Sequence, residues 1–257
     1  MLRTVCATRY VTPLREGGSL PAIIEADDLG LYVLKFRGAG QGPLALVAEL
    51  VAGEIGRKLG LKVPELVFVE VDPVLGRSEP DAEIQDLLQS SMGLNLGMDY
   101  LPGSVMFDPA AGETAEPGAA SAAVWFDAFV TNVDRTPRNP NLLCWHNELY
   151  FIDHGAAMYF HHGWEGADSR RIRELAAAPF APIRDHVLLP WATALLQADA
   201  DLRGRVDESA IQRVVQAVPD SWLRSREEKP MYVEYFLQRL KSGDFLQEAL
   251  DAQAKLV

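Results

Sequence analysis

The stretch that decides the fold runs Asn132-Val133-Asp134-Arg135-Thr136-Pro137-Arg138-Asn139-Pro140-Asn141 and, after an apolar strand and a turn, Leu149-Tyr150-Phe151-Ile152-Asp153-His154-Gly155. Asp134 follows an apolar segment and precedes a proline-containing run, so we expect it to lie in a loop. Asn139 comes five positions after Asp134, and Asp153 ends an apolar strand just before His154-Gly155. The stretch therefore places two carboxylates and an amide around a predicted hairpin.

The order of these three residues is typical of sites that transfer phosphoryl groups. In such sites the first Asp handles the acceptor hydroxyl, and the Asn and the second Asp hold Mg²⁺ on the ATP phosphates. A carboxylate that leaves a buried strand is costly unless it is paired or binds metal. We therefore predict Asp134 as the catalytic residue and Asn139 with Asp153 as Mg²⁺ ligands. Asn141 remains an alternative to Asn139, and an Asx turn is the structural alternative for Asp134.

The N-terminal part is expected to form a small antiparallel sheet with one helix. Residues 2–10, 22–25, 31–36 and 67–71 have the composition and alternation of strands. Residues 44–59 carry apolar side chains at helical spacing and end at Gly60, a usual helix stop. After Asp72-Pro73 the pattern becomes mainly helical, with residues 92–109 expected to be irregular. The chain is therefore predicted to be an α+β protein with an N-terminal domain over residues 1–72 and a C-terminal domain over residues 73–257.

Lys35 ends the apolar run of the third predicted strand, where its ammonium could reach the α- and β-phosphates of ATP. Such a Lys needs a carboxylate partner from the helix, and Glu49 and Glu54 are the candidates. We favour Glu49, because the small residues around it would allow close approach of another element. A solvent-facing Lys at a strand end is the plainer reading.

Gly17, Gly18 and Ser19 could form a loop that covers the phosphates, since glycine lets backbone amides approach phosphate oxygens. The motif is shorter than a full glycine-rich loop, and a hairpin turn explains it equally well.

The bulk composition limits the partners. The formal net charge of −12 argues against nucleic acid or an anionic membrane surface, since both call for clustered Lys and Arg. No run of roughly 18 apolar residues occurs, so no membrane span is expected. A disulfide between Cys6 and Cys144 is one alternative, but we expect two buried free thiols, which fits a reducing cytoplasm. The protein is therefore expected to be cytoplasmic.

Other chemistries fit less well. His154, His161 and His162 could suggest a transition-metal site with Asp153, but adjacent histidines seldom bind one ion, and Mg²⁺ disfavours imidazole. No G-x-S-x-G motif supports a serine hydrolase.

Three motifs together resemble the HipA-like kinase family, in particular a shorter bacterial branch: Tyr32-Val33-Leu34-Lys35, Asn132 to Asn139, and Phe151-Ile152-Asp153-His154-Gly155-Ala156-Ala157. Gly93-Leu94-Asn95 and Tyr100 to Ser104 are also similar to that branch. The resemblance covers roughly residues 1 to 165. Arg135 directly after the Asp is a departure that is also found in phosphoinositide-type lipid kinases and spore-coat kinases, and His154 replaces the usual aromatic residue.

The resemblance implies a two-lobed protein-kinase-like fold that binds Mg²⁺-ATP and phosphorylates Ser or Thr of a protein substrate. By position, Asp134 matches the catalytic Asp, Asn139 and Asp153 the metal ligands, and Lys35 the ATP lysine. Ser19 lies where some members carry a regulatory Ser. The best-known members are toxins with an antitoxin partner, which makes an antitoxin-like partner a further expectation. A small-molecule or lipid kinase and a nucleotide-binding pseudokinase or interaction module are the alternatives.

Overall fold

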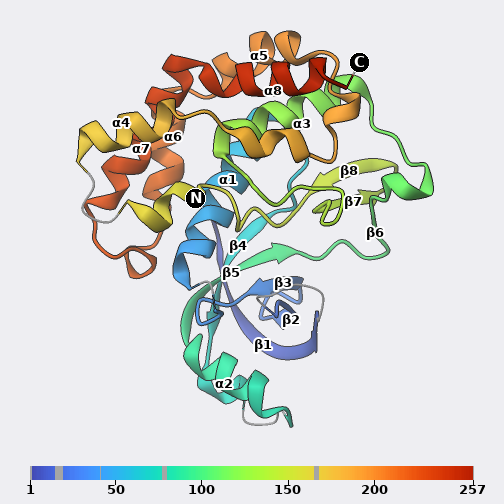
Figure 1. The fold of residues 1–257 in the computed structure, drawn as a ribbon. Helices are drawn as coiled ribbons and strands as arrows, with labels where there is room; N and C mark the ends of the chain where they lie inside the picture. The colour runs from blue at the N-terminus through green and yellow to red at the C-terminus, as the bar shows by residue number, and fades with distance from the viewer. Residues whose placement is uncertain (1, 15–19, 41, 77–79, 165–167, 257) are drawn as a thin grey trace.

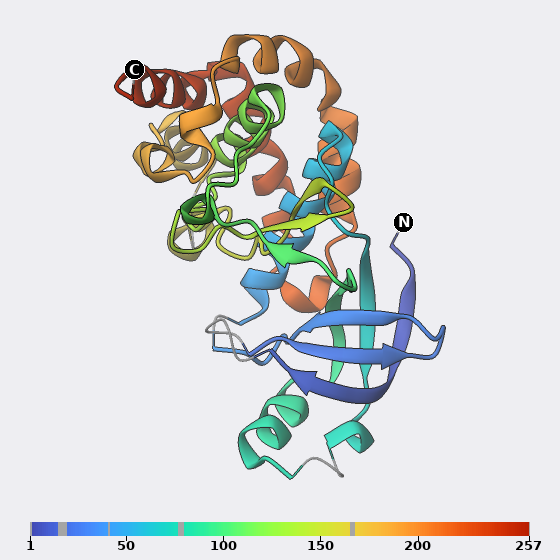
Figure 2. The same ribbon diagram turned by 90° about the vertical axis from the view of Figure 1, so that its right-hand side faces the viewer.

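A barrel of strands is followed along the chain by a larger, mainly helical part in the computed structural model, which describes residues 2–14, 20–40, 42–76, 80–164 and 168–256 (Figure 1). Helix α1 (Pro43–Leu59) lies between the barrel and the helices of the larger part, and α2 (Ala82–Ser90) lies at the far end of the barrel (Figure 2). The predicted α+β class is therefore confirmed.

Five strands form the barrel, in the spatial order β1 (Thr4–Pro13), β2 (Ala22–Ala26), β3 (Leu31–Lys35), β5 (Gly93–Asp99) and β4 (Leu66–Val71). Neighbours along this order pair antiparallel. β4 then pairs parallel with β1, from Thr4 opposite Phe68 to Cys6 opposite Glu70, and closes the barrel. The predicted antiparallel sheet is therefore correct for four of the five strand pairings, and the parallel pairing of β1 with β4 is the exception. The sequence did not indicate this pairing, because contact between strands so far apart in the chain leaves no local pattern.

Strand β5 was predicted to be irregular, and the structure corrects this. The prediction rested on Gly93, Gly97, Pro102 and Gly103 in residues 92–109. The strand nevertheless needs a glycine at position 97, because a Cβ there would lie 2.7 Å from Cγ2 of Val69. β5 pairs along its length with β3 and β4. The division of the chain at residue 72 stays a prediction, although these pairings favour a boundary after Asp99.

Helix α1 brings a carboxylate into the interior. It begins at Pro43, whose missing N–H would be unpaired in a first turn anyway, and it ends at Gly60, which adopts a left-handed φ of 93°. Its apolar residues, including Val47 and Val51, belong to the same buried cluster as Phe126 of α3. Burial of the helix on several sides also buries Glu49, which has no exposed surface.

The larger part consists of helices around an aromatic core. These helices are α3 (Pro117–Val130), α4 (Ser169–Ala177), α5 (Leu195–Leu202), α6 (Glu208–Gln216), α7 (Glu228–Ser242) and α8 (Asp244–Ala254). The ring of Phe129 lies 5.3 Å from Trp125, 5.3 Å from Phe236 and 5.6 Å from Phe245, so α3 is packed against α7 and α8. Short 3₁₀ turns connect the elements at Pro73–Gly76, Pro109–Ala111, Tyr159–Gly163, Ala181–Asp185, Leu189–Trp191, Arg203–Arg205 and Asp220–Trp222.

A three-stranded sheet combines one strand that precedes α3 with the predicted hairpin, which follows α3. Its strands are β6 (Val105–Met106), β7 (Leu142–Trp145) and β8 (Glu148–Phe151), in that order. His146 and Asn147 turn the hairpin with positive φ values, as a two-residue hairpin loop requires. The hairpin is confirmed at nearly the predicted bounds.

Two expectations about the surface can be compared with the structure. Cys6 is exposed and Cys144 is half-buried, so the prediction that both free thiols are buried is wrong. Cys6 alternates outward on β1, which local composition did not reveal. None of the helices in the described ranges combines the length and apolar character needed to cross a bilayer.

Candidate active site

Lys35 joins the barrel to the larger part of the molecule. It is the last residue of β3, and its Nζ lies 2.6 Å from Oε2 of Glu49 on α1 and 2.6 Å from Oδ1 of Asp153, which follows β8. Glu54 instead lies 3.4 Å from Arg57 on its own helix. Of the two helix carboxylates considered from the sequence, the structure places Glu49 against Lys35.

The charges of this triad stabilise one another. Burial alone would lower the pKa of Lys35, but the carboxylates of Asp153 and Glu49 outweigh burial and raise it. Burial raises the pKa of Glu49, whereas Lys35 and then His154 lower it, to a net value of about 2. Lys35 and Glu49 are therefore both ionised at neutral pH.

His154 lies behind Glu49 and is completely buried. Its Nδ1 is 3.5 Å from Oε1 of Glu49, and its ring packs edge-on against Phe126, with centroids 5.7 Å apart. Neither ring nitrogen has a hydrogen-bond partner among the described residues, nor has Glu49 Oε1. Glu49 is therefore the polar neighbour of the His154 imidazole. Sequence reasoning did not foresee this contact.

Asp134 lies in the predicted loop after α3. The loop is held by local bonds: Asn132 Oδ1 accepts the Asp134 N–H at 3.1 Å, and the Thr136 N–H donates to the Asp134 carbonyl at 3.0 Å. Asp134 Oδ2 accepts from Nδ2 of Asn139 at 2.7 Å and from Nδ2 of Asn141 at 3.3 Å. The structure therefore brings Asp134 together with both candidate asparagines.

The environment of Asp134 suits a group that accepts a proton. Burial raises its pKa most, the hydrogen bond from Asn141 opposes this, and the carboxylate of Asp153 raises the pKa further. The net shift is upward, because the two amides do not offset burial and like charge. A carboxylate with a raised pKa takes up a proton more readily.

Asp153 occupies a strained backbone position, with φ of 53°. Its side chain is 46% exposed, and only Oδ1 is engaged, by Lys35. Oδ2 of Asp153 and the amide oxygens of Asn139 and Asn141 accept no hydrogen bond from any described residue. Carboxylate and amide oxygens are the ligands that Mg²⁺ prefers, so this donor set fits a magnesium ion.

A buried charge network holds the loop that carries Asp134, and the sequence reasoning missed it. Asp127 is the charged residue of the otherwise uncharged helix α3, and it has no exposed surface. Its Oδ2 accepts from Nε of Arg135 at 2.5 Å and from Nε2 of His186 at 2.8 Å, while Oδ1 accepts from Asn132 at 3.0 Å. The sequence contained a signal for this network: Asp127 stands alone among apolar residues of a predicted helix, and Arg135 directly follows Asp134.

Arg135 connects this network to both ends of the hairpin. Its guanidinium donates to the carbonyl of Asn141, before β7, and to the carbonyl of Ile152, after β8, at 3.3 Å for Ile152. The pKa of Asp127 is lowered overall, although burial alone would raise it. The nearby Arg135 and His186 outweigh burial and favour the ionised carboxylate. The loop with Asp134 and the turn with Asp153 are therefore fixed to the same buried ion pair.

The histidine-metal alternative finds no support in the geometry. Burial lowers the pKa of His161 to about 3, with His162 adding to the effect, and its Nδ1 lies 3.0 Å from the hydroxyl of Tyr232. Among the residues that the structure describes, no three His, Cys, Asp or Glu side chains converge on a common point.

Gly17, Gly18 and Ser19 lie outside the described residues. Their proposed role as a phosphate-covering loop stays a prediction.

Two solved kinase structures are similar to this chain in fold. The chain has the fold of a Helicobacter pylori proinflammatory kinase, CtkA, with a TM-score of 0.58 and 14% identity over 96% of this chain and 99% of that one. It is also similar to the Golgi casein kinase with Mn and ADP bound, with a TM-score of 0.51 and 10% identity over 97% of this chain and 73% of that one. A search of curated proteins gave no match.

The family model for HipA-like kinases matches residues 8–249. This range includes the strand with Lys35, the loop with Asp134 and the hairpin that ends at Asp153, and it extends well beyond the part of the chain that carried the resemblance in the sequence. The chain therefore belongs to the HipA-like kinase family.

Proposed function

We propose that this kinase uses Mg²⁺-ATP to phosphorylate a Ser or Thr hydroxyl of a protein, in the cytoplasm. The observation that carries the proposal is the position of Lys35, 2.6 Å from both Glu49 and Asp153, beside a loop in which Asp134 faces two amides. Phosphoryl transfer depends mainly on charge placement, and this arrangement supplies a fixed cation, two anions and free oxygen ligands.

Each residue has a role in this proposal. Lys35 would bind the α- and β-phosphates, and Glu49 would fix its position. Asp153 with Asn139, or with Asn141, would hold Mg²⁺, which supplies charge neutralisation on the phosphates when bound. Asp134 would orient the acceptor hydroxyl and take its proton as the hydroxyl oxygen bonds to the γ-phosphorus and ADP leaves. The raised pKa of Asp134 supports that last role.

The similar structures support a nucleotide and a divalent metal as cofactors, but they do not identify the molecule that accepts the phosphate. The Golgi casein kinase structure holds Mn and ADP, which agrees with a nucleotide and a divalent metal here. An antitoxin-like partner rests on the family resemblance alone and stays a prediction.

The proposal is tested by separating nucleotide binding from transfer. Asp134→Asn should bind Mg²⁺-ATP with an affinity close to that of the wild type, because Asp134 is not proposed to contact the nucleotide, but transfer should fall by about a hundredfold or more. Transfer by this variant at the wild-type rate would remove Asp134 from the mechanism.

A further inference from the structure

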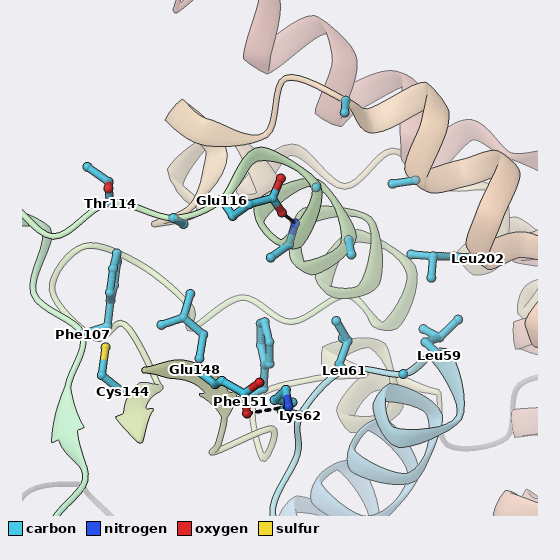
Figure 3. A pocket seen from close by; sticks show the side chains of 18 of the residues that line it. Leu59, Leu61, Lys62, Phe107, Thr114, Glu116, Cys144, Glu148, Phe151 and Leu202 are labelled. Atoms are coloured by element: carbon cyan, nitrogen blue, oxygen red, sulfur yellow. Dashed lines mark hydrogen bonds and ion pairs between the residues drawn. The ribbon is translucent and has the colours of Figure 1, made fainter. Parts of the chain in front are cut away.

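A cavity lies apart from the candidate active site and shares none of its residues. It has a volume of about 900 Å³ and is lined by the end of α1, the segment before α3, the first turns of α3, helix α5 and the β7–β8 hairpin (Figure 3). This volume is at the upper end of the range for ligand-binding pockets. We call it the hairpin groove.

The walls of the hairpin groove are apolar at depth. In Figure 3, Phe107 lies at one end and Leu59 and Leu202 lie at the other, with Phe151 and Leu61 between them. Apart from Leu61, which is half-buried, these side chains are nearly or fully buried and form part of the main core. A groove of this kind accommodates a large apolar side chain better than a polar one.

The rim of the hairpin groove is acidic. Glu113, Glu116 and Asp201 form no ion pair with any described residue. Glu148 is neutralised by Lys62, whose Nζ lies 2.6 Å away, and the remaining rim cation, Arg205, is tied to the carbonyl of Leu59 at 2.7 Å. The hydrogen bond to a neutral carbonyl leaves the charge of Arg205 in place, so outside the Lys62–Glu148 pair three carboxylates stand against one cation and the rim is net negative. This net charge disfavours phosphates, nucleic acid and anionic lipid as occupants and favours a cationic one.

The groove also contacts the element that carries the candidate metal ligands. Phe151 lies on its wall, and the guanidinium of Arg135 lies 5.3 Å from the centroid of that ring. Cys144 lines the groove from the other strand of the same hairpin. A protein bound in the groove would contact the β7–β8 hairpin. Asn141 directly precedes this hairpin and Asp153 follows it, so the bound protein would contact a segment that is close in the chain to the candidate metal ligands.

We propose that the hairpin groove is a docking site for a segment of a partner protein in which a large apolar side chain is flanked by Lys or Arg. The apolar side chain would fill the depth of the groove, and the cations would face Glu113, Glu116 and Asp201. This inference does not depend on phosphoryl transfer, because a docking segment is recognised whether or not its protein is phosphorylated.

The test uses the purified full chain and a displayed library of random peptides. We expect the selected peptides to be enriched in Lys or Arg around Leu, Ile, Met or Phe. A labelled synthetic copy of a selected peptide should bind at least about tenfold more weakly to Asp201→Lys and to Ala119→Arg, which reverse or add charge at exposed rim positions. Asp86→Lys, a matched reversal of an exposed Asp on α2, should leave binding unchanged.

Three results would overturn the proposal: selection of acidic or uncharged peptides, selection of no peptide at all, or binding that the two groove variants leave unaltered. Peptide binding and phosphoryl transfer are measured separately, so failure of one leaves the other standing.

Discussion

Nδ1 of His154 lies 3.5 Å from one oxygen of Glu49, while the other oxygen of the same carboxylate lies 2.6 Å from Nζ of Lys35. The first distance is long for a hydrogen bond, so His154 acts on Glu49 mainly through electrostatics. His154 directly follows Asp153, and it therefore links the turn of the candidate metal ligand to the helix that positions Lys35.

Replacement of this imidazole should affect ATP use more than folding. His154→Phe keeps a ring against Phe126 but removes the polar edge that faces Glu49, so we expect the KM for ATP to rise about threefold to tenfold, the effect of one lost polar interaction. His154→Gln should restore part of the loss. Initial rates at varied ATP, with thermal melts beside them, give the measurement. If His154→Phe has the wild-type KM for ATP, His154 contributes only packing and not a polar interaction with Glu49.

The two helix carboxylates form a matched pair for testing the partner of Lys35. Glu49→Gln leaves the cation with Asp153 alone, so we expect kcat/KM for ATP to drop by about tenfold to a hundredfold. Glu54→Gln, one turn and a half further along α1, should change it less than twofold, since Glu54 lies against Arg57. Equal losses in both variants would show that the effect comes from the helix and not from the ion pair.

The choice between Asn139 and Asn141 can be made with magnesium. If Asn139 is the ligand, Asn139→Ala should raise the Mg²⁺ concentration for half-maximal transfer about tenfold. Asn141 has a φ of 51°, so glycine is the replacement that avoids backbone strain there, and Asn141→Gly should have the smaller effect. A larger shift in Asn141→Gly would transfer the metal role to Asn141.

The buried pair of Asp127 and Arg135 should be visible in stability. Asp127→Asn leaves the guanidinium buried without its carboxylate and is expected to lower the free energy of unfolding by about 3–5 kcal/mol at pH 7. The folded-state pKa of Asp127 is below the unfolded value of about 3.9, so the pair stabilises the wild type above that pH and is lost as the pH falls below it.

Urea unfolding at a series of pH values measures this directly. The gap in stability between wild type and Asp127→Asn should be constant near neutral pH and should narrow below about pH 4. A gap that widens on acidification would contradict the assignment of Asp127 as the charged partner.

Local patterns were sufficient to predict most elements of the fold. Helix α1 and the β7–β8 hairpin were foreseen because helical spacing, a terminal glycine and turn residues are all encoded within a few positions. Strand β5 and the parallel closure of the barrel were not, because both depend on contacts between distant segments. Gly97 shows the difficulty. In the sequence a glycine suggests a loop, yet in the folded strand it is the residue that leaves room for the side chain of Val69.

The candidate site shows the same division. Asp134, Asn139 and Asp153 follow one another in a recognisable order, and the structure brings Asn139 to Asp134. The sequence could only favour Glu49 over Glu54, since the choice depends on which face of α1 meets the barrel. His186 lies 59 residues from Asp127, and no pattern connects two residues at such a separation.

The central claim is that the groups around Lys35 transfer phosphate from ATP to a protein. Its most direct test is incubation of the purified chain with γ-labelled ATP, Mg²⁺ and host lysate, beside Asp153→Ala. We predict label on a protein band that disappears with the variant, because Asp153 is proposed to hold the metal on the phosphates. Label on no protein, while nucleotide binding remains measurable, would contradict a protein kinase and would favour a small-molecule acceptor or a nucleotide-binding module.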